Sequence, residues 1–199
     1  MTAFGRSQTR RLAVVLSIIG SPFALLPFTV LLVSLRTASP ARALALAAAL
    51  ACLGIVPLIL LLRHNVRAGR WSDHDVSDRS HRREFYPIAM VVTAGTAVGM
   101  WLLGAPGVVV RGILVLLMLL IVASILSRWS KISLHTSVGA FCTVTLVTVN
   151  VWVAGGALIL ATAVGWARIS LERHTLWQVL NGAALGTAAG LIGLRPALF

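Results

Sequence analysis

Long apolar runs, interrupted by short polar segments, dominate this sequence. The runs cover residues 12–35, 43–62, 86–103, 108–126, 137–167 and 175–194. A helix of about 20 apolar residues crosses the hydrocarbon core of a bilayer, and only helices and closed barrels satisfy their backbone polar groups there. The sequence therefore predicts an all-α fold, an integral membrane bundle of six transmembrane helices.

Composition favours a membrane protein over a nucleic-acid-binding one. Hydrophobic residues make up 58% of the chain and charged residues 11%, whereas soluble domains carry about 25% charged residues. The net charge is +12, but the arginines flank apolar runs instead of forming a basic face for nucleic acid. We predict one membrane-embedded domain over residues 1–199, with a polar loop at 63–86 that contributes to an active site.

The run from 137 to 167 is too long for a single crossing. Its 31 residues would measure about 46 Å as one straight helix, against a hydrocarbon core of about 30 Å. We predict that it divides near Ala154, Gly155 and Gly156 into two short spans. Two spans then separate each of the polar clusters 75–83, 131–136 and 168–175 from the next, so the three clusters share one face of the membrane.

The placement of basic residues predicts which face this is. Of the 17 Lys and Arg residues, those on the opposite face are Arg36, Arg42, Arg111 and Arg195. Cytoplasmic loops of membrane proteins carry an excess of Lys and Arg. We therefore predict a multi-pass protein of the cell membrane whose polar clusters face the cytoplasm.

The clusters contain residue types that bind and transfer phosphate. Arg presents a planar fork of donors that matches phosphate oxygens, and His acts as a nucleophile or proton donor near neutral pH. His174 and Gln178 are four residues apart and share one helical face, where the Gln carbonyl can fix the His tautomer. Ser133 and His135 precede a span, and the N–H groups at a helix start favour an anion.

The spacing of these residues resembles the type-2 phosphatidic acid phosphatase superfamily, which shares its site with vanadium haloperoxidases. The third motif of that superfamily is Ser-Arg, five residues, His, three residues, Asp, and here Arg168 and His174 keep the spacing. Its second motif, Pro-Ser-Gly-His, stands as Ile132-Ser133-Leu134-His135. Of its first motif, Lys, six residues, Arg-Pro, Arg82 matches the Arg. The resemblance covers roughly Asp75 to Gly186.

The resemblance implies a role for each matched residue. His174 would attack phosphorus and form a phosphohistidine, and His135 would protonate the leaving lipid oxygen. The groups implied to hold the phosphoryl oxygens are Arg82, Arg168, Ser133 and the backbone around Leu134. The resemblance also implies that no metal or other cofactor is needed. The implied partners are membrane lipids and a lipid phosphate substrate of the polyprenyl-phosphate type or the phosphatidate or phosphatidylglycerophosphate type.

The chain departs from the superfamily's motifs at several positions. Asp75 stands where the first-motif Lys belongs, and Arg79 or Lys131 could supply the missing cation. Arg83 replaces the Pro. Gln178 replaces the Asp that orients the nucleophile; Gln can position the ring but cannot offset the charge of an imidazolium, a task for which Asp75, Asp78 or Glu172 could serve.

These departures leave other functions open. One is a non-catalytic lipid-phosphate-binding or transport protein on the same scaffold. Another is a metal-dependent phosphotransferase, because the polar loop is rich in metal-ligand residue types; these are Asp73, His74, Asp75, Asp78 and His81. The spacing in this loop matches no compact ligand motif, and such a segment is more often a solvated loop.

Overall fold

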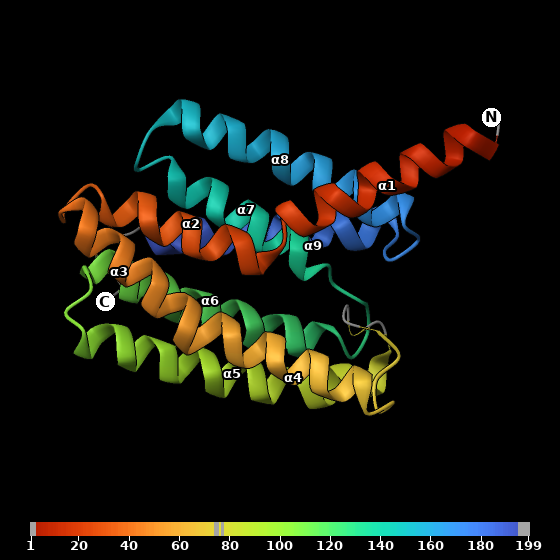
Figure 1. Cartoon of the computed structure of the whole chain (residues 1–199), viewed down its shortest axis with the longest axis horizontal. Helices are drawn as coiled ribbons and strands as arrows, with labels where there is room; N and C mark the ends of the chain where they lie inside the picture. Colours follow the sequence, from red (N-terminus) through yellow and green to blue (C-terminus); the bar gives the residue numbers. More distant parts are fainter. Residues whose placement is uncertain (1–2, 74–75, 77, 195–199) are drawn as a thin grey trace.

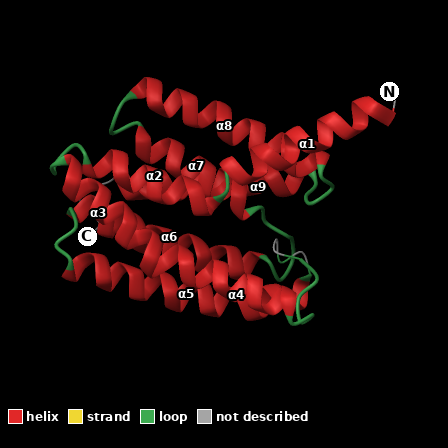
Figure 2. Cartoon of the chain, in the orientation of Figure 1, coloured by secondary structure: helices red, strands yellow, loops and turns green. Residues whose placement is uncertain are grey.

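The computed structural model describes residues 3–73, 76 and 78–194, and only the backbone of residues 3–6 and 79. This part of the chain is helical and contains no strand (Figure 2), which confirms the all-α prediction. Its elements are α1 (Ala3–Ile19), α2 (Pro22–Ser34), α3 (Pro40–Leu50), the π-helical segment η1 (Ala51–Ile55), α4 (Val56–Arg67), α5 (Arg79–Leu102), α6 (Gly107–Leu126), α7 (Leu134–Leu146), α8 (Val151–Ser170) and α9 (Leu176–Leu194).

Several helices are compatible with a multi-pass membrane protein. Four described helical stretches are long and apolar enough to cross a bilayer, namely 40–67, 80–102, 107–126 and 151–170. The pair formed by α1 and α2 is a fifth if it counts as one span. Helix α7 is apolar but has only 13 residues. The predicted number of six spans is therefore not confirmed. It was also inconsistent with the predicted division of the 31-residue run, because six apolar runs of which one divides in two give seven spans.

The first apolar run is broken between α1 and α2. The two helices meet at an angle of 45°, and α2 begins at Pro22. Proline cannot donate a backbone hydrogen bond, so it suits the first position of a new helix better than the interior of an old one. Pro22 thus marks a helix break, whereas Pro27 lies inside α2.

The 31-residue run divides as predicted, but the predicted position of the break was wrong. Helix α7 ends at Leu146 and α8 begins at Val151. The side chain of Asn150 accepts a hydrogen bond from the backbone N–H of Trp152 at 2.8 Å, as in a standard helix N-cap. Gly155 and Gly156 lie inside α8 instead. A polar cap, and not the glycine pair, therefore starts the second helix.

The helices form two groups that face each other (Figure 1). Helices α3 to α6 make up one group, and α1, α2, α7 and α8 the other, while α9 packs against both α6 and α7. The contact between α7 and α9 depends on Gly182, Gly186 and Gly190, because a Cβ atom at any of them would overlap α7. Small residues at this spacing let two helices approach closely, and the packing fixes the position of α7.

The described residues of the three polar clusters lie at the same end of the bundle, at the right in Figure 1. Helices α4, α6 and α8 end there, and α5, α7 and α9 begin there. The segment 127–133 turns back into the bundle, because Ile132 and Ser133 are buried. Helix α7 consequently starts inside the protein, close to the ends of its neighbours.

Candidate functional site

A cavity of about 180 Å³ lies between the two helix groups and brings the three clusters together. The basic side chains that line it are Arg82, Lys131, His135, Arg168 and His174. They come from α5, the segment before α7, α7 itself, the last turn of α8 and the α8–α9 loop. Residues up to 92 positions apart in sequence therefore line one cavity. This agrees with the prediction that the three clusters lie close together.

The spacing between Arg168 and His174 is explained by a tight turn at the end of α8. The carbonyl of Arg168 accepts hydrogen bonds from the backbone N–H of Arg173 at 3.0 Å and of His174 at 3.2 Å. Glu172 takes a positive φ of 56°, a conformation that lets the chain reverse direction. The turn returns His174 to the level of Arg168, so both side chains reach the cavity.

His174 contacts Gln178 as predicted, but the two residues do not share a helical face, because His174 lies in the loop before α9. The Nδ1 atom of His174 lies 3.1 Å from Oε1 of Gln178. The same oxygen accepts a hydrogen bond from the backbone N–H of Thr175 at 3.3 Å. A backbone N–H can only donate, so the Gln178 atom at this position is the oxygen, and a hydrogen bond from Nδ1–H to it fixes the tautomer. The Nε2 atom is then the unprotonated nitrogen of a neutral His174.

Gln178 also caps helix α9. Its backbone N–H lies 3.4 Å from Oγ1 of Thr175, while its side chain accepts from the Thr175 N–H. This reciprocal pair is a capping box, in which a Thr and a Gln three residues apart satisfy each other's backbone groups. Gln178 therefore ties the orientation of His174 to the start of α9. Two carboxylates of the polar loop contact other residues. Asp73 pairs with Arg173 at 3.2 Å, and Asp78 accepts a hydrogen bond from the hydroxyl of Ser72 at 2.9 Å.

The second cluster forms the start of α7. Ser133 is fully buried, and its carbonyl accepts bonds from Ser137 N–H at 3.0 Å and Thr136 Oγ1 at 3.1 Å. Its own hydroxyl has no hydrogen-bond partner among the described residues. Leu134 and His135 line the cavity, so the amino-terminal end of α7, with its partial positive charge, faces the space that Arg82 and Arg168 also line.

The remaining predicted phosphate ligands differ in position. Lys131 lines the cavity, and its Nζ donates to the carbonyl of Arg173 at 2.8 Å, which links the segment before α7 to the α8–α9 loop. Arg79 begins α5, but its side chain lies outside the described part of the chain, as does Asp75. Arg83 is exposed and does not belong to the cavity lining.

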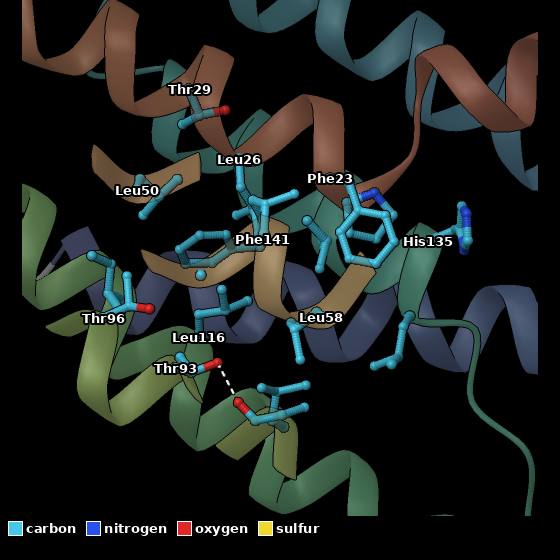
Figure 3. A pocket seen from close by; sticks show the side chains of 18 of the residues that line it. Phe23, Leu26, Thr29, Leu50, Leu58, Thr93, Thr96, Leu116, His135 and Phe141 are labelled. Atoms are coloured by element: carbon cyan, nitrogen blue, oxygen red, sulfur yellow. Dashed lines mark hydrogen bonds between the residues drawn. The ribbon is translucent and has the colours of Figure 1, made fainter. Parts of the chain in front are cut away.

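Beyond its polar end the cavity is apolar. Figure 3 shows His135 at one side, then Phe23 and Leu58, and then Leu26, Phe141 and Leu50 further along. From Arg82 to Thr96, both of which line the cavity, α5 advances by about 21 Å at 1.5 Å per residue. One bilayer leaflet has a hydrocarbon depth of about 15 Å. The site therefore joins a cationic end to an apolar space of lipid-chain length.

Sequence reasoning missed two side chains at this site. The hydroxyl of Ser17 on α1 accepts a hydrogen bond from Arg168 Nη1 at 3.1 Å, and no sequence signal links residues so far apart. Tyr86 lines the cavity and is 1% exposed. Its position four residues after Arg82, on the same helical face, is a signal that could have identified it.

The chain was compared with protein-family models, with curated proteins and with solved structures, and none of the three comparisons gave a match. The chemistry of the cavity therefore carries the functional argument. One end of the cavity is formed by its basic side chains, the His174–Gln178 pair and the start of α7, and apolar side chains form the rest.

Proposed function

We propose that this chain is a metal-independent membrane phosphatase that hydrolyses a phosphomonoester or pyrophosphate of a lipid. The observation that carries the proposal is the single cavity that joins Arg82, Arg168 and the His174–Gln178 pair to an apolar interior. The arginines and the histidine at one end suit a phosphate group, and the apolar walls suit the hydrocarbon attached to it. Substrates of the polyprenyl-phosphate or phosphatidate type have both parts.

The first half of the reaction forms a phosphoenzyme. Nε2 of His174 attacks phosphorus while the bond from phosphorus to the lipid oxygen breaks, and His135 gives its proton to the leaving oxygen. Arg82, Arg168 and the start of α7 donate hydrogen bonds to the phosphoryl oxygens. Fixed donors are effective here because phosphoryl transfer spreads charge over those oxygens.

The second half returns the enzyme to its starting state. Water attacks the phosphorus of the phosphohistidine, the bond from phosphorus to nitrogen breaks, and His135 accepts a proton from the water. The products are inorganic phosphate and the lipid alcohol from a phosphomonoester, or inorganic phosphate and the lipid monophosphate from a pyrophosphate. His174 regains its lone pair on Nε2, while the hydrogen bond from Nδ1 to Gln178 supports the same tautomer throughout.

Phosphate release from detergent-purified protein in excess chelator tests the proposal. A short-chain lipid phosphate is the substrate, and His174→Ala is the decisive variant. His64→Ala is a matched control, because His64 lies at the end of α4, is exposed and does not line the cavity. Release by the wild type and by His64→Ala, together with loss in His174→Ala, supports the proposal. Release that needs added metal would contradict it.

The active site of this enzyme is proposed to face the cytoplasm. The test is cysteine labelling in intact cells and in inverted vesicles, in a Cys52→Ser background, because Cys52 is exposed and Cys142 is buried. Ser130→Cys and Glu172→Cys at the site end should be labelled from the cytoplasm. Thr148→Cys, in the exposed link between α7 and α8, should be labelled from the other side. The reverse pattern would put the site on the outer face.

A lipid-phosphate binder without turnover is the second candidate function. It is favoured by the neutral Gln178, which occupies the place of a carboxylate in the resemblance and already serves as the cap of α9. A neutral amide orients a histidine but does not offset the positive charge that develops on it. Saturable binding of a lipid phosphate, without phosphate release under any of the conditions above, would select this function.

A further inference from the structure

The hydroxyl of Tyr86 is a buried donor that the described protein does not satisfy. Tyr86 is 1% exposed and lines the cavity, and its oxygen has no hydrogen-bond partner among the described residues. Buried polar groups are almost always hydrogen-bonded, and a buried tyrosine hydroxyl usually finds a partner. The cavity is the place from which such a partner can come.

The ring of Tyr86 is held firmly by its neighbours. It belongs to a core cluster that includes Leu62, Ala89 and Leu120. The ring of Phe85 packs against it edge to face, with centroids 6.1 Å apart. A ring packed in this way has little freedom to turn its hydroxyl toward another acceptor.

The charges around the cavity determine which acceptor suits this hydroxyl. Arg82 lies one turn before Tyr86 on the same face of α5, and Lys131 and Arg168 line the same cavity. Arg and Lys side chains donate hydrogen bonds and cannot accept them. An O–H group that shares a cavity with such cations is complemented by an anionic oxygen.

We infer that Tyr86 is a further substrate-binding residue, whose hydroxyl donates a hydrogen bond to a phosphate oxygen on the lipid side of the bound headgroup. The inference rests on the proposed function, because it assigns Tyr86 to the same substrate. Tyr86 lies about 6 Å further along α5 than Arg82, at 1.5 Å per residue, toward the apolar part of the cavity. A phosphate at this position can place an attached hydrocarbon chain in the apolar part of the cavity, so we expect it to bind better than free phosphate.

Tyr86 is the only tyrosine of the chain, so protein labelled with ζ-¹³C-tyrosine gives a single NMR signal from the carbon that bears the hydroxyl. The probes are inorganic phosphate and octylphosphonate, a phosphorylated chain that cannot be hydrolysed. We expect the signal to shift on titration with octylphosphonate at concentrations at which inorganic phosphate has little effect. An equal response to both would show a phosphate site without lipid selectivity, and no response to either would overturn the inference.

The Tyr86→Phe variant removes the hydroxyl and keeps the ring. A hydrogen bond to a charged group contributes about 1.5–3 kcal/mol, so we expect the Kd for octylphosphonate to rise about 10- to 100-fold. Thr143→Val is the matched control, because it removes a hydroxyl that does not line the cavity and is already bonded to the carbonyl of Gly139 at 2.9 Å. Its Kd should remain unchanged.

Thermal unfolding of the ligand-free protein separates this role from a structural one. Replacing an unsatisfied hydroxyl by hydrogen leaves stability unchanged or raises it, so Tyr86→Phe should not lower the Tm. A lower Tm, or an unchanged Kd, would overturn the inference. These outcomes do not depend on catalysis. If the wild type binds octylphosphonate through Tyr86 but releases no phosphate, only the proposed phosphatase activity is refuted. If the wild type releases phosphate and the Tyr86→Phe variant binds octylphosphonate normally, only the role of Tyr86 is refuted.

Discussion

Arg168 Nη1 donates a hydrogen bond to Ser17 Oγ across 3.1 Å, and the two residues are 151 positions apart in sequence. Both side chains are buried, with exposed fractions of 3% for Arg168 and 8% for Ser17. Helix α1 packs against α8, so this bond fixes the guanidinium relative to the first helix. The amino-terminal helix thereby supports Arg168, a cavity-lining arginine from the carboxy-terminal part of the chain.

Removing this support should weaken catalysis without removing any group that contacts substrate. Ser17→Ala is expected to lower kcat about 3- to 10-fold, the usual range for one hydrogen bond of about 0.5–1.5 kcal/mol. A double-mutant cycle with Arg168→Lys checks the mechanism. The Ser17 effect should disappear in the Arg168→Lys background, and fully independent effects would show that Ser17 does not act through Arg168.

The two arginines of the third cluster should differ sharply when each is replaced by Lys. Arg168 is buried and lines the cavity, whereas Arg173 is partly exposed and pairs with Asp73 at 3.2 Å. Arg168→Lys keeps the charge but loses the fork of donors, so we expect kcat/KM to fall by about 10²–10³, the effect of losing one transition-state donor. Arg173→Lys, the matched control, should change it by less than about threefold, because a partly exposed ion pair contributes little. Equal small effects would count against Arg168 as a phosphate ligand.

His135 should matter most for substrates with a poor leaving group. His135→Ala is expected to slow hydrolysis of an alkyl phosphate by about 10²–10⁴, the usual contribution of general acid–base catalysis. The loss should be much smaller for p-nitrophenyl phosphate in the phosphoenzyme-forming step, because nitrophenolate leaves without a proton. Single-turnover measurement of leaving-group release compares the two substrates. A loss that is the same for both would remove His135 from the role of general acid.

The packing of α7 against α9 gives a prediction on stability. A Cβ atom at Gly186 would overlap the backbone of Ser137, whereas one at Gly155 would meet nothing within 4 Å. Overpacking of this kind costs about 1–3 kcal/mol, so Gly186→Ala should lower the Tm and also the activity, because α7 carries His135. Gly155→Ala should leave the Tm unchanged or raise it, since Ala favours a helix by up to about 1 kcal/mol. Thermal unfolding in detergent measures both, and a Gly186→Ala protein as stable as the wild type would contradict this packing.

The parts of the fold and site that depend on local sequence spacing could be predicted. The contact between His174 and Gln178 was expected from their spacing, but His174 makes it from the loop before α9, through the oxygen of Gln178 that also caps this helix. The convergence of the clusters follows from the number of helices between them. The predicted position of the break in the 31-residue run was wrong because glycine flexibility was given more weight than helix capping. Asn150 accepts a hydrogen bond from the backbone N–H of Trp152 and starts α8, while the glycines fit inside this helix.

Contacts between distant helices could not be predicted in this way. Nothing in the sequence around Ser17 indicates Arg168, because their contact depends on how α1 packs against α8. The burial of Tyr86 likewise depends on Leu62 and Leu120 from other helices. Periodicity identifies the face of a helix on which a residue lies, but not the helix that this face meets.

Trapping the phosphoenzyme is the most direct test of the central claim. The protein is mixed in chelator with a lipid phosphate labelled in its phosphate group, quenched within one turnover, and digested to locate the labelled residue. The account predicts an acid-labile, base-stable phosphoryl group on His174 of the wild type. The His174→Ala protein should be unlabelled and should release no phosphate, whereas His64→Ala should be labelled normally. Full phosphate release by His174→Ala, or a label on another residue, would contradict it.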